Sequence, residues 1–248
     1  MKIGRFSVDG GDPRYGVLDG EDWVVFAGDP MFQGMETTGE RVAAADAKLL
    51  APVIPRSKVV GIARNYGGER GDAPLVFLKP NTTVVGPGDA IQLPPVGTID
   101  HEGELVIVIG RIAKRVKAEN YADVVFGYTV GNDVGATDVI MADRELARGK
   151  GYDTFAPIGP VIETEFDWAA ADIQTSVSGE SRISGNTRDM LHSVPEIIEF
   201  VSDIWTLLPG DVIMTGSPVG SGVIVAGQTV DVTIEGIGTL SNPVRDRA

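Results

Sequence analysis

Residues 100–110 read Asp-His-Glu-Gly-Glu followed by Leu-Val-Ile-Val-Ile-Gly. The apolar part has the length and the β-branched content of a buried strand. Alternate residues of a strand face the same side, so Glu102 and Glu104 are expected to direct two carboxylates at one point. Their repulsion is unfavourable unless a cation, a proton or a basic side chain lies there. The pair therefore indicates a metal site, although a solvated strand end could carry the same two acids.

Composition narrows the partners and the chemistry open to this chain. Its 248 residues can bury a full core, and 43% hydrophobic with 23% charged residues is ordinary for a globular protein. The formal net charge of -14 opposes binding to nucleic acid or to an anionic membrane. With no cysteine and two histidines, thiolate sites and histidine-rich metal sites are excluded. No apolar run approaches the ~18 residues of a membrane span, which favours a cytoplasmic protein.

The first part of the chain predicts a small β-rich domain. Alternating patterns predict strands over residues 2–8, 15–18 and 22–26, with a hairpin turn at Asp19-Gly20. The alanine-rich segment 41–50 is expected to form a helix, and Pro52 and Pro55 mark a boundary after it. We therefore expect a domain over 1–55 and a larger one over 56–248.

The second part is rich in strands and is interrupted by glycine and proline. Strands are expected over residues 59–63, 75–79, 105–110, 124–130, 155–162, 173–177, 212–215, 230–234 and 238–244. A polar helix is expected over 138–148, ended by Gly149-Lys150-Gly151. Ser193 and Glu196 form a capping box that begins an amphipathic helix. The pattern predicts a mostly β fold with some α-helix.

Four further features could contribute to a site around the two glutamates. Asp133 follows the strand 124–130 and is either a third metal ligand or a turn residue. The glycine-rich segment 65–72 is either a lid or an ordinary surface loop. Lys150, between two glycines, is either a mobile surface residue or a cation that faces substrate. Backbone amides of the loop 216–222 could bind an anionic group.

Seven blocks in order resemble the fumarylacetoacetate hydrolase family over residues from about 58 to 246. The resemblance is greatest to its short bacterial members known as oxaloacetate decarboxylases or 2-hydroxyhepta-2,4-diene-1,7-dioate isomerases. The blocks are residues 61–66, 77–80, 101–105, 132–134, 149–155, 157–160 and 209–218. The resemblance implies a core of rolled mixed β-sheet, a homodimer and a place in the catabolism of aromatic compounds.

The resemblance also implies roles for individual residues. Glu102, Glu104 and Asp133 would hold Mg²⁺ or Mn²⁺, and Lys150 would contact the substrate as a catalytic residue. The further residues expected to bind substrate are Arg64, Tyr66, Lys79, Thr215, Gly216 and Ser217.

The expected lid departs from the family pattern. Family members commonly carry a His and a Glu there, a dyad that activates water for hydrolysis. Glu69 stands at the position of the His and Asp72 at that of the Glu, in a shorter lid, and these two are the candidate catalytic pair. Thr137 replaces a usual Arg, while Ser217 replaces a usual Thr and keeps the hydroxyl. His192 is expected to serve packing, and His101 lies beside the metal pair, so neither replaces the lid histidine.

Three carboxylates without nitrogen or sulfur ligands select a hard cation, Mg²⁺ first and Mn²⁺ next. Such an ion leaves positions for a 2-oxo acid and stabilises the enolate formed from it. Lys79 and Lys150 would supply positive charge for a dicarboxylate in an acidic protein.

Glu replaces His as a water-activating base only if burial raises its pKa. We therefore expect decarboxylation or keto-enol isomerisation of a small 2-oxo (di)carboxylic acid. The alternatives are hydrolytic carbon-carbon cleavage of an acylpyruvate and a metal-binding protein without catalysis.

Overall fold

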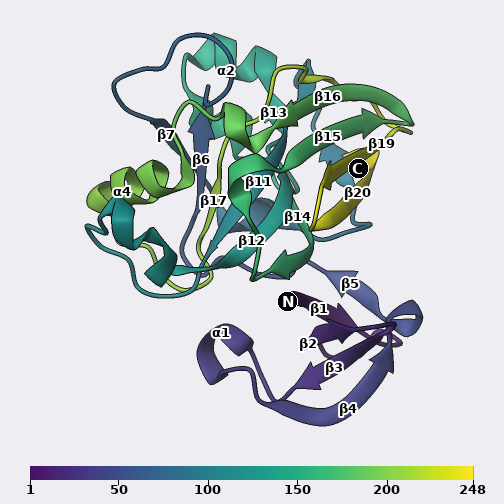
Figure 1. The fold of residues 1–248 in the computed structure, drawn as a ribbon. Coiled ribbons are helices and arrows are strands. Elements are labelled where there is room, and N and C mark those ends of the chain that lie inside the picture. The colour runs from purple at the N-terminus through teal and green to yellow at the C-terminus, as the bar shows by residue number, and fades with distance from the viewer. Residues whose placement is uncertain (248) are drawn as a thin grey trace.

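One twelve-stranded sheet joins the two parts of the chain in the computed structural model, which describes residues 1–247. Its N-terminal strands are β1 (Lys2–Ser7), β2 (Arg14–Asp19), β3 (Asp22–Phe26), β4 (Thr37–Ala43) and β5 (Lys48–Leu50). They lie beneath the main body in Figure 1, together with the short helix α1 (Pro30–Gln33). The hairpin expected at Asp19-Gly20 is present, since Asp19 pairs with Asp22.

The expected helix over residues 41–50 is wrong. The segment ends β4 at Ala43, makes a 3-10 turn over Ala44–Asp46 and continues as β5. In this arrangement β4 pairs with β3 and β5 pairs with β1. An isolated helix of this length is marginally stable in water, so the hydrogen bonds offered by two neighbouring strands outweigh the helical preference of alanine.

The central strands of the large sheet carry the site. They are β6 (Val59–Ala63), β7 (Leu75–Lys79), β11 (Gly103–Ile109), β12 (Val125–Asn132), β14 (Ala156–Glu163) and β17 (Val212–Met214). Their order is β14-β12-β11-β17-β6-β7, and the short β8 (Val84–Val85) also pairs with β14. Because β11 is paired on both edges and buried along its whole length, it is the continuous apolar strand that its sequence predicts.

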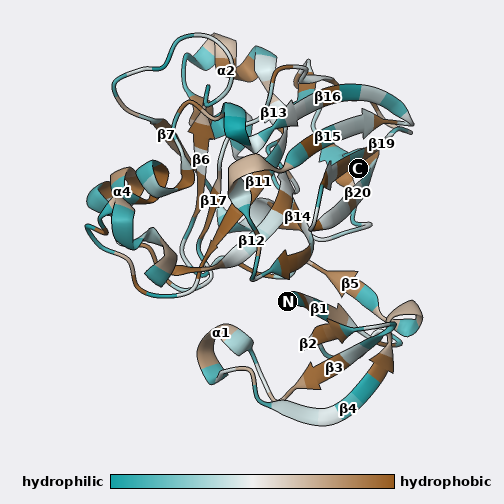
Figure 2. Ribbon diagram, viewed as in Figure 1, coloured by the Kyte–Doolittle hydropathy of each residue, from teal (hydrophilic) through white to brown (hydrophobic). Residues whose placement is uncertain are grey.

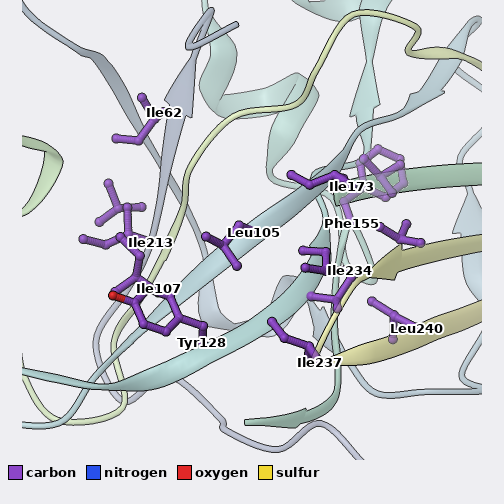
Figure 3. Packing of buried hydrophobic residues seen from close by; sticks show 14 of the residues in the cluster. Ile62, Leu105, Ile107, Tyr128, Phe155, Ile173, Ile213, Ile234, Ile237 and Leu240 are labelled. Atoms are coloured by element: carbon purple, nitrogen blue, oxygen red, sulfur yellow. The ribbon is translucent and has the colours of Figure 1, made fainter. Parts of the chain in front are cut away.

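A five-stranded sheet packs beside the central strands. It consists of β16 (Glu180–Asn186), β15 (Asp172–Val177), β19 (Thr229–Ile234), β20 (Gly238–Asp246) and β9 (Ile91–Leu93). Figure 3 shows the resulting core, in which Ile107 of β11 lies beside Tyr128 and Ile213, and Leu105 lies between these residues and Ile173 and Ile234. A three-stranded sheet is formed by β10 (Ile99–His101), β13 (Gly135–Ala136) and β18 (Gly222–Val223). The expected mostly β fold with a rolled mixed sheet is confirmed.

Three further helices lie on the large domain: α2 (Thr137–Asp143), α3 (Leu146–Lys150) and α4 (Val194–Ile204). The 3-10 turns beyond the first are Asn81–Thr83, Ala118–Asp123, Trp168–Ala170 and Thr187–Asp189. The helix expected over 138–148 is split, because Arg144 adopts a left-handed conformation with φ of 57°. Lys150 therefore belongs to the last turn of α3 instead of following a helix.

The helix α4 begins as its sequence predicts. Ser193 and Glu196 make the capping box, and Ile197, Ile198 and Val201 are buried. Figure 2 shows hydrophobic residues along β6 and β17 in the interior and hydrophilic residues on the outer side of the molecule. Within residues 1–247, no helix is both long and apolar enough to cross a lipid bilayer.

Candidate metal centre

Three carboxylates converge where β11 and β12 pair. Glu104 lies on β11, Glu102 lies in the break between β10 and β11, and Asp133 follows the last residue of β12. One oxygen from each lies within 4.8 Å of the other two. The backbone amide of Asp133 donates to the carbonyl oxygen of Glu102 at 2.8 Å, so the pairing of the two strands brings the third acid to the first two.

The convergence depends on a residue that sequence reasoning missed. The side-chain oxygen of Asn132 accepts the backbone N–H of Glu102 at 2.9 Å, while its side-chain nitrogen is buried without a hydrogen-bond partner. Asn132 thereby holds the irregular backbone at Glu102, where the strand is interrupted. The Asn-Asp dipeptide at the end of an apolar strand is the signal in the sequence that points to this residue.

Two buried lysines surround Asp133. The Lys150 ammonium donates to Oε2 of Glu102 at 2.7 Å and to the carbonyl oxygen of Asp133 at 2.9 Å, and lies 3.0 Å from Oδ2 of Asp133. The Lys79 ammonium donates to Oδ1 of Asp133 and to the carbonyl oxygens of Val134 and Phe155.

These contacts correct the role expected for Lys79. Its side chain is 0% exposed, and an ammonium group has three protons, all of which have protein acceptors. Lys79 is therefore a buried counter-charge that orients Asp133, and it is not placed to bind substrate directly.

Burial and like charges set the protonation of the cluster. Burial, together with the charges of Asp133 and Glu102, holds the pKa of Glu104 well above its usual range. Burial also raises the pKa of Glu102. It would do the same for Asp133, but Lys150 and Lys79 outweigh it and lower the pKa of that carboxyl. A divalent cation would relieve the repulsion that acts on Glu104.

The end of β17 closes another side of the cluster. The backbone N–H of Gly216 donates to Oε2 of Glu104 at 2.7 Å, and the φ of 97° at Gly216 favours glycine. The Thr215 hydroxyl donates to the carbonyl oxygen of Leu105 at 2.9 Å, and the Ser217 hydroxyl to that of Pro218 at 3.2 Å. Gly216 thus positions Glu104, whereas the Thr215 hydroxyl is engaged by the backbone of β11. A role of either residue in binding substrate stays a prediction. The Ser217 hydroxyl is likewise engaged by the protein.

The loop between β6 and β7 begins at the cluster and then leaves it. Asn65, a second residue that we missed, donates to the carbonyl oxygens of Thr215 and His192 at 2.8 and 3.0 Å. The next residue, Tyr66, is buried, and its hydroxyl has no hydrogen-bond partner. Burial and the charge of Glu104 raise its pKa, so the phenol stays protonated and remains a potential donor.

The remaining loop residues lie outside the cluster. Arg64, Glu69 and Asp72 are exposed, and none of them makes a hydrogen bond or ion pair with another of the residues 1–247. Only Arg70 anchors the exposed part, by donating to Glu196 of α4 and to the carbonyl oxygen of Leu191. The candidate pair Glu69 and Asp72 is therefore not assembled with the three carboxylates in this conformation.

The donor set fits a hard divalent cation. Every candidate ligand atom is a carboxylate oxygen, Glu104 and Asp133 are buried while Glu102 is partly exposed, and no histidine or thiolate takes part. Oxygen ligands of this kind are typical of Mg²⁺ and Mn²⁺ sites. Both ring nitrogens of His101, next to Glu102 in the chain, are buried without a partner, and burial lowers its pKa.

The fold is a rolled mixed sheet with a cluster of three carboxylates at the ends of its central strands. Comparison with known proteins identifies the family. The fumarylacetoacetate (FAA) hydrolase C-terminal family matches residues 58–245, so the chain belongs to this family. The Rv2993c-like N-terminal family matches residues 1–52.

Individual relatives are similar over most of the chain. Protein Rv2993c of Mycobacterium tuberculosis is 47% identical over 84% of this chain and 82% of its own. Oxaloacetate tautomerase YisK of Bacillus subtilis is 38% identical over 81% of this chain and 74% of its own. The relatives of this family that are named as a tautomerase, an isomerase or a hydrolase are enzymes.

Solved structures agree with the fold. 5-Carboxymethyl-2-hydroxymuconate delta-isomerase from Mycobacterium smegmatis is 42% identical with a TM-score of 0.95, and both chains are covered completely. Maleylpyruvate hydrolase from Sphingobium sp. SYK-6, in complex with manganese (II) ion and pyruvate, is 30% identical with a TM-score of 0.83, again over both whole chains.

Proposed function

We propose that this protein is a Mg²⁺- or Mn²⁺-dependent isomerase of a small 2-oxo (di)carboxylic acid, which interconverts keto and enol forms. The observation that carries the proposal is the convergence of Glu102, Glu104 and Asp133, with the candidate pair Glu69 and Asp72 exposed on the loop away from them. Relatives named as a tautomerase and an isomerase support this reaction. Decarboxylation of the same class of acid is distinguished from isomerisation by the release of CO₂.

The protein's own residues divide the work in this proposal. Glu102, Glu104 and Asp133 hold the cation, and Lys79 holds Asp133 in place. A bound divalent cation would draw electrons from the 2-oxo group and so make the neighbouring proton more acidic. The Tyr66 hydroxyl, buried and free of other partners, donates a hydrogen bond to a substrate oxygen. Lys150 contributes positive charge for a carboxylate.

Hydrolytic carbon-carbon cleavage is the second candidate, because a hydrolase relative was solved with manganese and pyruvate. Hydrolysis needs a base that activates water. Glu69 and Asp72 are exposed on the loop, and neither contacts the three carboxylates. The loop would have to bring Glu69 to the cluster for this residue to activate water.

The reaction is tested by supplying enol-oxaloacetate and an acylpyruvate side by side with Mg²⁺. We expect faster loss of the enol absorbance with oxaloacetate recovered as the keto acid. Release of CO₂ would indicate decarboxylation, and rapid acylpyruvate cleavage with inert oxaloacetate would refute the proposal in favour of hydrolysis. Binding of pyruvate without turnover of any oxo acid would indicate a binding protein.

The metal ligands are tested separately by Glu102→Gln and Asp133→Asn. Both changes keep the side-chain size and remove one anionic ligand. We expect Mg²⁺ affinity to fall more than about 100-fold, since even the outer partners of metal ligands are worth about 10- to 100-fold. Isothermal titration calorimetry measures the affinity, with the exposed Glu119→Gln as control. Unchanged Mg²⁺ affinity in both variants would refute the assignment.

Three expectations, which concern the oligomeric state, the location and the metabolic role of the protein, stay proposals. A homodimer, a cytoplasmic location and a place in aromatic compound catabolism follow from the family resemblance and the composition alone. Sedimentation velocity of the purified protein tests the first of them directly.

A further inference from the structure

Lys150 occupies the oxygens that a cation would need. Its ammonium lies 2.7 Å from Oε2 of Glu102 and 3.0 Å from Oδ2 of Asp133, and donates to the carbonyl oxygen of Asp133 at 2.9 Å. The residue is 4% exposed. All three of its protons therefore have protein acceptors, and none is left for the carboxylate of a substrate.

The charges of the cluster show why this contact matters. Three carboxylates face two ammonium groups, so the cluster has a formal charge of -1 without a metal, and a divalent cation changes it to +1. Buried like charges repel strongly because the interior screens them poorly. A lysine ammonium then has to move away from the cation, or an anion has to bind beside it.

Of the two lysines, Lys150 is the one that can move away when a cation binds. Lys79 lies within the strand β7 and is 0% exposed at its side chain, held by backbone carbonyl oxygens as well as by Asp133. Lys150 instead lies at the end of the five-residue helix α3. Its side chain passes Gly135, where an added Cβ would lie 3.0 Å from Cε and 3.2 Å from Nζ of Lys150. The missing side chain at Gly135 leaves the space through which Lys150 reaches the cluster.

We propose that Lys150 is the resident counter-cation of the metal centre. Its ammonium competes with the divalent cation for Glu102 and Asp133, and once it gives up these carboxylates it is free to bind an anionic substrate. The inference rests on the proposed metal centre. Because binding effects are reciprocal, cation and anion should each promote binding of the other.

The test is titration of Mn²⁺ into the purified full chain by calorimetry and by electron paramagnetic resonance. Lys150→Met removes the competing charge, and we expect it to bind Mn²⁺ at least about 10-fold more tightly than the wild type. Lys150→Arg keeps the charge and should not bind more tightly. Lys117→Met, which removes an exposed lysine on the surface, is the control and should leave Mn²⁺ affinity unchanged.

Pyruvate provides the second readout. In the wild type, pyruvate should bind more tightly with Mn²⁺ than without it, and Lys150→Met should lose most of this gain. Circular dichroism checks that each variant is folded. If Lys150→Met does not fold, Lys150→Gln, whose amide can donate to the same carboxylates without charge, is judged by the same criteria.

The outcomes separate the two proposals. A wild-type protein that does not bind Mn²⁺ would refute the metal centre itself. Wild-type binding with no tighter binding in the uncharged Lys150 variants would overturn the counter-cation role alone. Equal tightening in Lys150→Arg and Lys150→Met would also overturn it, because shape and not charge would then be responsible.

Discussion

Gly103 separates the two glutamates of the cluster and has no room for a side chain. An added Cβ would lie 2.2 Å from Oγ1 of Thr175 and 2.8 Å from Cγ1 of Val232, both in the neighbouring sheet. The close approach of β11 to β15 and β19 thus depends on glycine at this position. The residue between the ligands therefore fixes the distance between the two sheets at the metal centre.

Gly103→Ala should consequently destabilise the protein and disturb the cluster. Overpacking of a core costs about 1–3 kcal/mol. We expect a loss of that size in the free energy of unfolding, measured with urea, together with weaker Mn²⁺ binding. Gly222→Ala is a matched control, since no atom lies within 4 Å of its added Cβ. Equal losses in the two variants would contradict the packing explanation.

Tyr66 allows stability and activity to be separated at one residue. Its hydroxyl is buried without a partner, so Tyr66→Phe removes an unsatisfied polar group and should not lower the free energy of unfolding. If the hydroxyl donates to the substrate as we propose, kcat should fall about 100-fold, the effect of losing one donor to developing charge. Thermal unfolding and enol-oxaloacetate turnover measure the two quantities. A stable variant with full activity would exclude a role for the hydroxyl.

At the scale of elements, α4 connects the loop between β6 and β7 to the body of the protein. Glu196 accepts hydrogen bonds from Ser193 in the capping box and from Arg70 of the loop. The Arg70 guanidinium and the Ser193 backbone N–H hold the pKa of Glu196 at about 2, below its ordinary 4.5. One carboxylate therefore caps the helix and anchors the loop.

The lowered pKa of Glu196 determines how the stability of the protein depends on pH. A lowered folded-state pKa stabilises the protein above the ordinary value of 4.5, and the contribution is lost as the pH falls towards about 2. Glu196→Gln should therefore unfold at lower urea concentration than the wild type at pH 6, and the two should converge near pH 2. Equal midpoints at pH 6, or a difference that persists at pH 2, would show that the charge of Glu196 is not the cause.

At the scale of the whole molecule, Asp211 ties the segment after the N-terminal domain to the central sheet. Its buried carboxylate accepts hydrogen bonds from the backbone and side chains of Ser57 and Lys58 and from the backbone of Leu208. Burial would raise its pKa, but Lys58 and Ser57 outweigh this and lower it. The parallel pairing of β6 with β17 begins directly beyond these residues.

Asp211→Asn should therefore be more destabilising than a change of surface charge. Breaking a buried ion pair by removing one partner costs about 3–5 kcal/mol. We expect the free energy of unfolding to fall by about 3 kcal/mol, since asparagine keeps one acceptor. Asp203→Asn, at an exposed ion pair, should change it by less than about 1 kcal/mol. Urea unfolding followed by tryptophan fluorescence measures both variants.

Sequence alone determined those features that depend on neighbours in the chain. The apolar run after Glu104 and the Ser193 capping box specified a buried strand and a helix start, because period and capping are local properties. The acids Glu102, Glu104 and Asp133 could be named from strand ends and from the family resemblance, and the structure brings them together.

Tertiary structure alone decided what depends on residues far apart in the chain. Residues 41–43 and 48–50 form strands because β3 and β1 offer them hydrogen bonds, which no local pattern reveals. Lys79 lies 54 positions before Asp133 and was expected at the substrate, but packing buried it behind the metal ligand. Asn65 lies 150 positions before Thr215, whose carbonyl oxygen it binds. The sequence sets the direction of each side chain on its own element, and only packing determines which distant group that side chain meets.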